Sequence, residues 1–223
     1  AKTTYHNTVA LGTKAKATGE QNVAIGFSSA SAGSNSIALG RESVTTSEGD
    51  VALGYGAKAD KNNAIAIGRS ATTSAENTIA QGNGAKALAT SVVAIGESAS
   101  GNTDGAVAIG KGANVTGAKN AVAIGKSATA TNGGSAGNVT AVGNNANANG
   151  RGTTALGGDA KAKGGNATAV GNWAEANGYR SVALGVSAKA GKVVDNEKVV
   201  NGAVAIGGNA EAMETDAIAL GID

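Results

Sequence analysis

The chain has 223 residues, 36 of them glycine, and contains neither cysteine nor proline. Its 18 basic and 16 acidic residues are scattered, which argues against the clustered basic patch of a nucleic-acid-binding protein. The absence of cysteine excludes a disulfide scaffold, a thiolate metal site and a cysteine nucleophile. With one Trp, one Phe and three Tyr, the chain also lacks the side chains of an ordinary globular core.

The N-terminal region offers neither a membrane segment nor a catalytic group. No apolar run approaches the roughly 20 residues that span a bilayer, and no signal peptide opens the chain. We therefore expect the chain to be cytoplasmic, mature or excised from something longer. The one histidine, His6, stands beside Tyr5 without nearby partners for catalysis or metal binding, so we expect it on the surface. The sequence predicts no catalytic residue, no metal site and no cofactor, and hence no enzyme.

From residue 7 onward the chain is an internal repeat. A short apolar phrase ending in glycine recurs fifteen times, and eleven of the fourteen steps between these glycines are 14 residues long. The other steps are 15, 18 and 22 residues. The repeat glycines are Gly12, Gly26, Gly40, Gly54, Gly68, Gly82, Gly96, Gly110, Gly125, Gly143, Gly157, Gly171, Gly185, Gly207 and Gly221. A period this short and regular is typical of a solenoid.

Each repeat predicts two short strands. Before the glycine the order is aliphatic, Ala, aliphatic, which is the period-2 alternation of a strand. After the glycine, small residues alternate with polar ones, as in Ala15, Lys16 and Ala17. Two turns rich in Gly and Asn would join the strands, since these residues tolerate positive φ. Because one such unit cannot bury its apolar side alone, we expect about fifteen stacked coils of an all-β parallel solenoid.

The alternation also raises the question of which residues point inward. We expect the larger side chains, such as Val122 and Ile124, to fill the coil opposite Ala128 and Ala130. The alanine two positions before each glycine would then lie outside, where its constancy indicates close steric approach by another subunit. A coil this thin favours an obligate oligomer with closed symmetry. The trimer-interface candidates are Ala10, Ala24, Ala38, Ala52, Ala66, Ala80, Ala94, Ala108, Ala123, Ala141, Ala155, Ala169, Ala183, Ala205 and Ala219.

Four residues interrupt the aliphatic positions. Thr140, Thr154 and Thr168 occupy the same position in three successive coils. We interpret them as a structural ladder inside the coil that shares hydroxyl hydrogen bonds. Gln81 stands where Ile or Leu is expected and must find polar partners if it is buried. We expect a polar defect there and no ligand contact.

Outward-facing residues of the second strand supply weak candidates for a ligand surface. Lysines recur at one outward position, but Glu175 and Glu211 interrupt the series, as in an ordinary solvated face. Phe27, Tyr55, Trp173 and Tyr179 are expected to be exposed. The ligand-surface candidates are Lys16, Lys58, Lys86, Lys161, Lys189, Trp173 and Tyr179.

The 22-residue step inserts a segment at about 189–202. Its two valine pairs, at 193–194 and 199–200, predict a small hairpin with Asp195 and Asn196 at its turn. Such a hairpin would either dock on a neighbouring subunit or present a binding surface.

Four phrases carry a family resemblance: "NSIALG" at 35–40, "NAIAIG" at 63–68, "NAVAIG" at 120–125 and "RSVALG" at 180–185. They resemble the repeat of YadA-like heads, which belong to the trimeric autotransporter adhesins of Gram-negative bacteria. The resemblance covers nearly the whole chain. It implies a left-handed parallel β-roll assembled as a homotrimer, displayed on the cell surface and anchored in the outer membrane by a C-terminal part. We expect residues 1–223 to be a single head domain, with the neck, stalk and anchor outside this chain.

The resemblance implies a head that binds host extracellular matrix or cell-surface proteins and serves virulence. Flat β-rolls of this kind could also bind one another and agglutinate bacteria. Two alternatives stay open: a structural spacer or fibre segment without a ligand, and an ice-binding solenoid. The last needs flat ranks of threonine, which the varied outward positions do not supply. No nucleic acid is expected as a partner, and the membrane only through the missing anchor.

Overall fold

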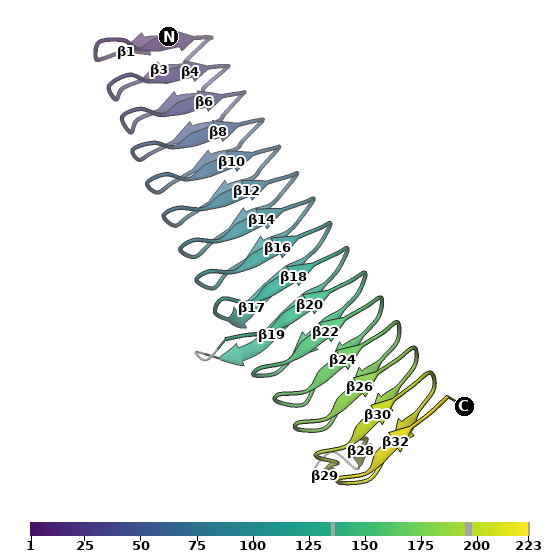
Figure 1. Ribbon diagram of the computed structural model, residues 1–223. Helices are drawn as coiled ribbons and strands as arrows, with labels where there is room; N and C mark the ends of the chain where they lie inside the picture. The colour runs from purple at the N-terminus through teal and green to yellow at the C-terminus, as the bar shows by residue number, and fades with distance from the viewer. Residues whose placement is uncertain (135–136, 195–197, 223) are drawn as a thin grey trace. The chain divides into compact units, whose positions relative to one another are not determined.

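The structure is a computed structural model that describes residues 1–134, 137–194 and 198–222. The chain divides into two compact units, Ala1–Gly112 and Ala113–Asp223. Both are parallel β-solenoids in which strands that precede a repeat glycine alternate along the chain with strands of a second sheet, which follow a repeat glycine except for the first of them, β1 (Lys2–Thr3) (Figure 1). Eight turns belong to the first unit and seven to the second. The predicted all-β solenoid of about fifteen turns is confirmed.

In the first unit, the strands before the glycines form one sheet, which we call the pre-glycine sheet. It consists of β2 (Val9–Leu11), β4 (Val23–Ile25), β6 (Ile37–Leu39), β8 (Val51–Leu53), β10 (Ile65–Ile67), β12 (Ile79–Gln81), β14 (Val93–Ile95) and β16 (Val107–Ile109). The post-glycine sheet consists of β1 (Lys2–Thr3), β3 (Lys16–Ala17), β5 (Ala30–Ser31), β7 (Val44–Thr45), β9 (Lys58–Ala59), β11 (Thr72–Thr73), β13 (Lys86–Ala87) and β15 (Ser100–Gly101).

The second unit repeats this plan with longer post-glycine strands near its start. Its pre-glycine sheet consists of β18 (Val122–Ile124), β20 (Thr140–Val142), β22 (Thr154–Leu156), β24 (Thr168–Val170), β26 (Val182–Leu184), β30 (Val204–Ile206) and β32 (Ile218–Leu220). Its post-glycine sheet consists of β17 (Asn114–Ala118), β19 (Thr129–Gly134), β21 (Asn147–Asn149), β23 (Lys161–Ala162), β25 (Glu175–Ala176), β27 (Lys189–Ala190) and β31 (Glu211–Ala212).

Equivalent residues of successive turns lie side by side. In β10, Ala66 pairs with Ala52 of β8 and with Ala80 of β12, and all three strands are parallel. Each position of the 14-residue repeat therefore becomes a row of residues that runs along the unit. Because the rows are continuous, one position of the repeat determines the chemistry of one whole row.

The repeat glycines are required by the close stacking of the corners. Gly12 has φ +125°, a region that L-residues rarely adopt, and a Cβ there would lie 2.6 Å from the carbonyl oxygen of Gly26. Gly26 meets Gly40 in the same way, with φ +131° and a Cβ 2.4 Å from the carbonyl oxygen. A side chain at this corner would push successive turns apart, so each turn that is followed by another turn needs glycine.

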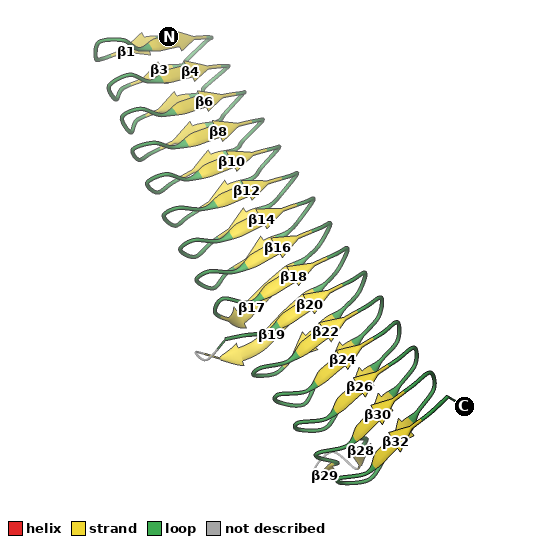
Figure 2. Ribbon diagram, viewed as in Figure 1, coloured by secondary structure: helices red, strands yellow, loops and turns green. Residues whose placement is uncertain are grey.

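The insertion forms a small antiparallel pair. Strand β28 (Val193–Val194) pairs with β29 (Lys198–Val199), with Val193 opposite Val199. The predicted hairpin is confirmed in its strands, while Asp195 and Asn196 at its expected turn lie outside the described residues. In the described part of the chain, Figure 2 shows strands and loops, and no helix there is long and apolar enough to cross a membrane.

Candidate functional site

The constant alanine of each repeat lies inside the coil, so the predicted orientation of the pre-glycine strand is wrong. The alanines from Ala24 to Ala205 in this row are 0% exposed, and only those of the first and last pre-glycine strands, Ala10 and Ala219, are half-buried. These side chains face the small residues of the post-glycine sheet, such as Ala57 and Ala59, which are also 0% exposed. They cannot form the contact surface of a trimer.

The physical reason is the thinness of the coil. Its two sheets approach so closely that alanine from both sides fills most of the space, and a larger buried side chain such as Val92 faces a glycine. The turn that contains Val92 shows the limit. Val92 is fully buried, and a Cβ added to the facing Gly101 would lie 2.6 Å from its Cγ1. The close approach that keeps the row alanine therefore comes from the opposite sheet of the same coil.

The aliphatic residues that flank each alanine point outward instead of into the core. In β18 the exposed fraction of Ile124 is 37%, and Val122 is half-buried. The same pattern holds in β8, where Leu53 is 39% exposed, and in β26, where Leu184 is 43% exposed. In each unit the pre-glycine sheet thus presents two adjacent rows of Val, Ile and Leu to solvent. We call this surface the aliphatic face.

The polar interruptions lie on the aliphatic face too. Thr140, Thr154 and Thr168 are stacked in register, but they point outward from β20, β22 and β24 and are half-buried. Their predicted place inside the coil is therefore wrong, and among the described residues no hydrogen bond joins their hydroxyls. Gln81 is exposed in β12, between Ile67 and Ile95 of the neighbouring turns.

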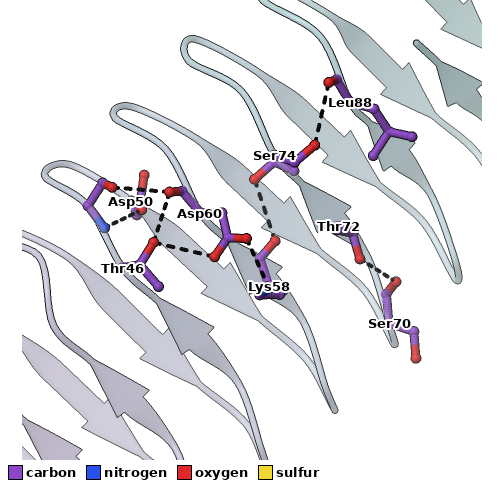
Figure 3. A network of polar contacts seen from close by, with 10 residues as sticks. Thr46, Asp50, Lys58, Asp60, Ser70, Thr72, Ser74 and Leu88 are labelled. Carbon is purple, nitrogen blue, oxygen red and sulfur yellow. Dashed lines mark hydrogen bonds and ion pairs between the residues drawn. The ribbon is translucent and has the colours of Figure 1, made fainter.

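The outward surface of the post-glycine sheet, which we call the polar face, carries the lysine series. Lys16, Lys58 and Lys86 are exposed in the first unit. Lys58 Nζ lies 2.9 Å from Asp60 Oδ2, and the Thr46 hydroxyl donates a 2.8 Å hydrogen bond to the Asp60 carbonyl (Figure 3). This face is an ordinary solvated surface with local ion pairs.

In the second unit the lysines of the polar face alternate with glutamates. Lys161 Nζ lies 2.8 Å from Glu175 Oε1, and Lys189 Nζ lies 2.7 Å from Glu211 Oε1. The hydrogen bond to Lys161 holds the pKa of Glu175 below its usual value, and the same bond raises the pKa of Lys161. The alternation places opposite charges on adjacent parallel strands, which stabilises the ladder.

The aromatic side chains that were predicted to be exposed are exposed, and they stand at the corners of the coil. Phe27 and Tyr55 are each 45% exposed, and the Arg41 guanidinium lies 5.6 Å from the first ring centroid and 5.5 Å from the second. Tyr179 is 42% exposed, with Arg180 5.0 Å from its ring. Trp173 is 56% exposed and has φ +56°, which is unusual for a bulky residue. Sequence analysis missed this backbone strain and the arginine partners of the rings.

The interior of the first turns is polar, which sequence analysis also missed. Asn22 Nδ2 donates a 3.0 Å hydrogen bond to the Ser31 carbonyl, and the Ser36 backbone N–H donates to Asn22 Oδ1. Asp50 is 0% exposed, and its carboxylate accepts the N–H groups of Ser47 and Ala64 at 2.9 and 3.1 Å. Loss of hydration raises the pKa of Asp50, although these hydrogen bonds counteract the rise. The partners are all internal, so this cluster is structural.

Among the residues that the structure describes, no group of three or more His, Cys, Asp or Glu side chains is placed to hold a metal ion. His6 lies at the first turn and is exposed. The extended, repetitive faces remain as the surface through which this chain can act, and the aliphatic face is the part that water solvates least well.

The sequence matches one family model, and the fold is similar to that of a solved structure. The family model of the YadA head domain repeat matches residues 6–29, 23–43, 46–71, 74–99, 93–113, 99–128, 140–160, 162–188 and 201–222. Among solved structures, the collagen-binding domain of the Yersinia adhesin YadA is similar, with 24% sequence identity and a TM-score of 0.42. That match covers 67% of this chain and 68% of the other. No curated protein matches this chain in sequence.

Proposed function

The chain belongs to the family of YadA head domain repeats, which are heads of trimeric autotransporter adhesins and not enzymes, and on that premise we propose that it is a trimeric adhesive head for host matrix or cell-surface protein. The observation that carries the assembly is the aliphatic face. Rows of exposed or half-buried Val, Ile and Leu run along both units without a partner in the single chain. Contiguous apolar surface of this extent is rare on a stable monomer.

The occupant of the aliphatic face is a second and third copy of the same chain. Identical flat faces are self-complementary, and closed cyclic symmetry covers them on every copy. The adhesins of this family are trimers, so the closed ring has three members. In such a trimer the aliphatic rows take the place that the alanine rows held in the sequence prediction, and each polar face is turned to solvent.

The ligand then meets the polar face and the corners. Lys16, Lys58 and Lys86 in the first unit, with Trp173 and Tyr179 in the second, are the groups that we propose for that contact. The Yersinia relative is described as collagen-binding, and an extended matrix protein suits a repetitive surface because many weak contacts add up. Three copies in one particle strengthen binding further through effective concentration. Display at the bacterial outer membrane, as for the adhesins of this family, completes the proposal.

Two measurements test the proposal in sequence. Light scattering of the purified chain should give three times the chain mass of 21.1 kDa. Immobilised collagen, fibronectin and laminin should then reveal saturable binding to at least one of them. The contact residues are tested with the double variant Lys16→Gln and Lys86→Gln, which should weaken binding. Its mass in light scattering is the control and should remain that of the trimer. A stable monomer contradicts the assembly, and a trimer without saturable binding supports a structural spacer instead.

A further inference from the structure

A solenoid that associates through repeated rows has a problem of register. Successive turns of the aliphatic face present nearly the same residues, so one copy can slide along another by one turn and still bury Val, Ile and Leu. A parallel ladder spaces its strands by about 4.8 Å, so such a slip is small. The apolar rows alone therefore discriminate poorly between the correct alignment and its neighbours.

Gln81 breaks this degeneracy in the first unit. In the row directly before the glycine, the paired residues run Leu53, Ile67, Gln81 and Ile95. Within that unit Gln81 is the one polar residue on the aliphatic face. Its side chain is exposed, and among the described residues no hydrogen bond reaches its amide. The amide therefore has its carbonyl oxygen and both N–H donors available to a partner copy.

We propose that Gln81 sets the axial register of the trimer, an inference that rests on the proposed assembly. In a closed threefold arrangement each Gln81 lies at the same height as its two copies, so each amide can donate to the next in a ring. A one-turn slip instead places Gln81 of one copy against Ile67 or Ile95 of another. The amide then loses water without gaining a partner, which is unfavourable. A single polar residue in an apolar seam fixes register in coiled coils in the same way.

The second unit carries a separate polar block with the same logic. Thr140, Thr154 and Thr168 occupy the other row, three positions before the glycine, in consecutive turns. A block of three turns meets its own copies fully only when the chains are aligned, and every slip places at least one hydroxyl against Val. Each unit thus has its own register marker, and we test the one in the first unit because it is a single residue.

Engineered cysteines can report the register because the chain has none of its own. Two single-cysteine chains, Leu39→Cys and Leu53→Cys, are refolded together as full-length chains and oxidised, and the disulfide-linked peptides are quantified by mass spectrometry. Links between identical positions report aligned copies, and a link between positions 39 and 53 reports a one-turn slip. A disulfide requires Cα atoms within about 7 Å, and an offset of one turn is only about 4.8 Å, so the slipped link is scored relative to its fraction in the chain that retains Gln81.

The comparison is made in three backgrounds, each of which also carries Thr140→Val, Thr154→Val and Thr168→Val, so that the polar block of the second unit cannot hold the register. With Gln81 present, links between identical positions should dominate. In Gln81→Ile the slipped link should increase on the order of tenfold, as expected when the cost of an unpaired amide is removed. The matched control, Gln81→Ile combined with Ile95→Gln, moves the polar residue by one turn and should restore alignment.

The outcomes separate the two proposals. Light scattering is measured on every variant, and a monomeric mass contradicts the assembly itself. A trimer with the same fraction of slipped links in all three backgrounds leaves the assembly standing and overturns the role of Gln81. A trimer in which the slipped fraction rises in Gln81→Ile and falls again in the control supports it.

Discussion

The two outer faces of each unit are built on the same coil, and they differ sharply in chemistry. The pre-glycine sheet presents rows such as Ile65 and Ile67, whereas the post-glycine sheet of the same turn presents Thr72. Both sheets turn alanine or other small residues inward, so the interior does not account for the difference. The two faces differ in their outward side chains, which are mostly aliphatic on the pre-glycine sheet and mostly polar on the post-glycine sheet. This difference indicates that the two faces have different surroundings in the proposed assembly.

An aliphatic residue in a β-solenoid need not belong to the core of its own coil. Here the coil is held together by ladder hydrogen bonds and by closely packed alanine. The larger side chains lie on the aliphatic face, where the proposed trimer would use them for contact between chains. The polar face on the opposite side would stay in solvent in that assembly.

The largest effect should follow from charging the aliphatic face. In Ile67→Asp each chain would bring an unpaired carboxylate into the proposed interface, at a cost of about 3–5 kcal/mol. The matched control is Thr72→Asp, which puts the same charge on the polar face of the same turn. Light scattering should show loss of the trimer in Ile67→Asp and an unchanged mass in Thr72→Asp. Equal behaviour of the two variants would mean that the faces do not differ in function.

A smaller effect is expected inside the coil. In Gly101→Ala the new Cβ would lie 2.6 Å from Val92 Cγ1 and 3.2 Å from Ala106 Cβ, and overpacking of this kind costs about 1–3 kcal/mol. The double variant Val92→Ala with Gly101→Ala removes the clash and should recover much of that loss. Ser100→Ala, on the polar face next to it, should change little. Urea unfolding at one fixed chain concentration measures the wild-type chain, these three variants and the single variant Val92→Ala, and simple additivity of the two substitutions would contradict direct contact.

The repeat allowed the solenoid, its turn count and its glycine corners to be predicted, because these follow from the spacing of Gly12, Gly26 and their equivalents. It did not determine which residues point inward. Period-2 alternation says which side chains share a face but not which face is buried. We assumed that larger side chains fill the coil, and the narrow gap between the sheets reverses that rule. The small residues after the glycine, such as Ala15 and Ala17, already pointed to a core made of alanine.

Only part of the candidate site was predicted, because the alternation does not say which face of a strand is buried. The constancy of the alanine row was rightly interpreted as steric crowding, but the crowding comes from the opposite sheet. The exposure of Trp173 and Tyr179 was predicted and is confirmed. The strained backbone of Trp173 and the buried Asp50 depend on how turns stack, and no local pattern in the sequence indicates them.

The smallest effect should come from the polar face. The Lys161–Glu175 ion pair is half-exposed, so Glu175→Gln should destabilise the chain by less than about 1 kcal/mol near neutral pH. Because the pKa of Glu175 is lowered in the folded chain, its contribution is present above the unfolded value of 4.5 and is lost as the pH falls through the folded value. Lys161 has a raised pKa, so its contribution is present below 10.5 and is lost only as the pH rises through the raised value.

The measurement is the difference in urea midpoint between the wild-type chain and Glu175→Gln across the pH range. The difference should be present at neutral pH and vanish in acid, where the wild-type carboxyl is protonated and equivalent to the amide. High salt should also reduce it, because exposed charges are screened. A difference that persists in acid would show that Glu175 acts through packing and not through charge. Packing, and not charge, would then determine what the polar face contributes to stability, as proposed for the aliphatic face.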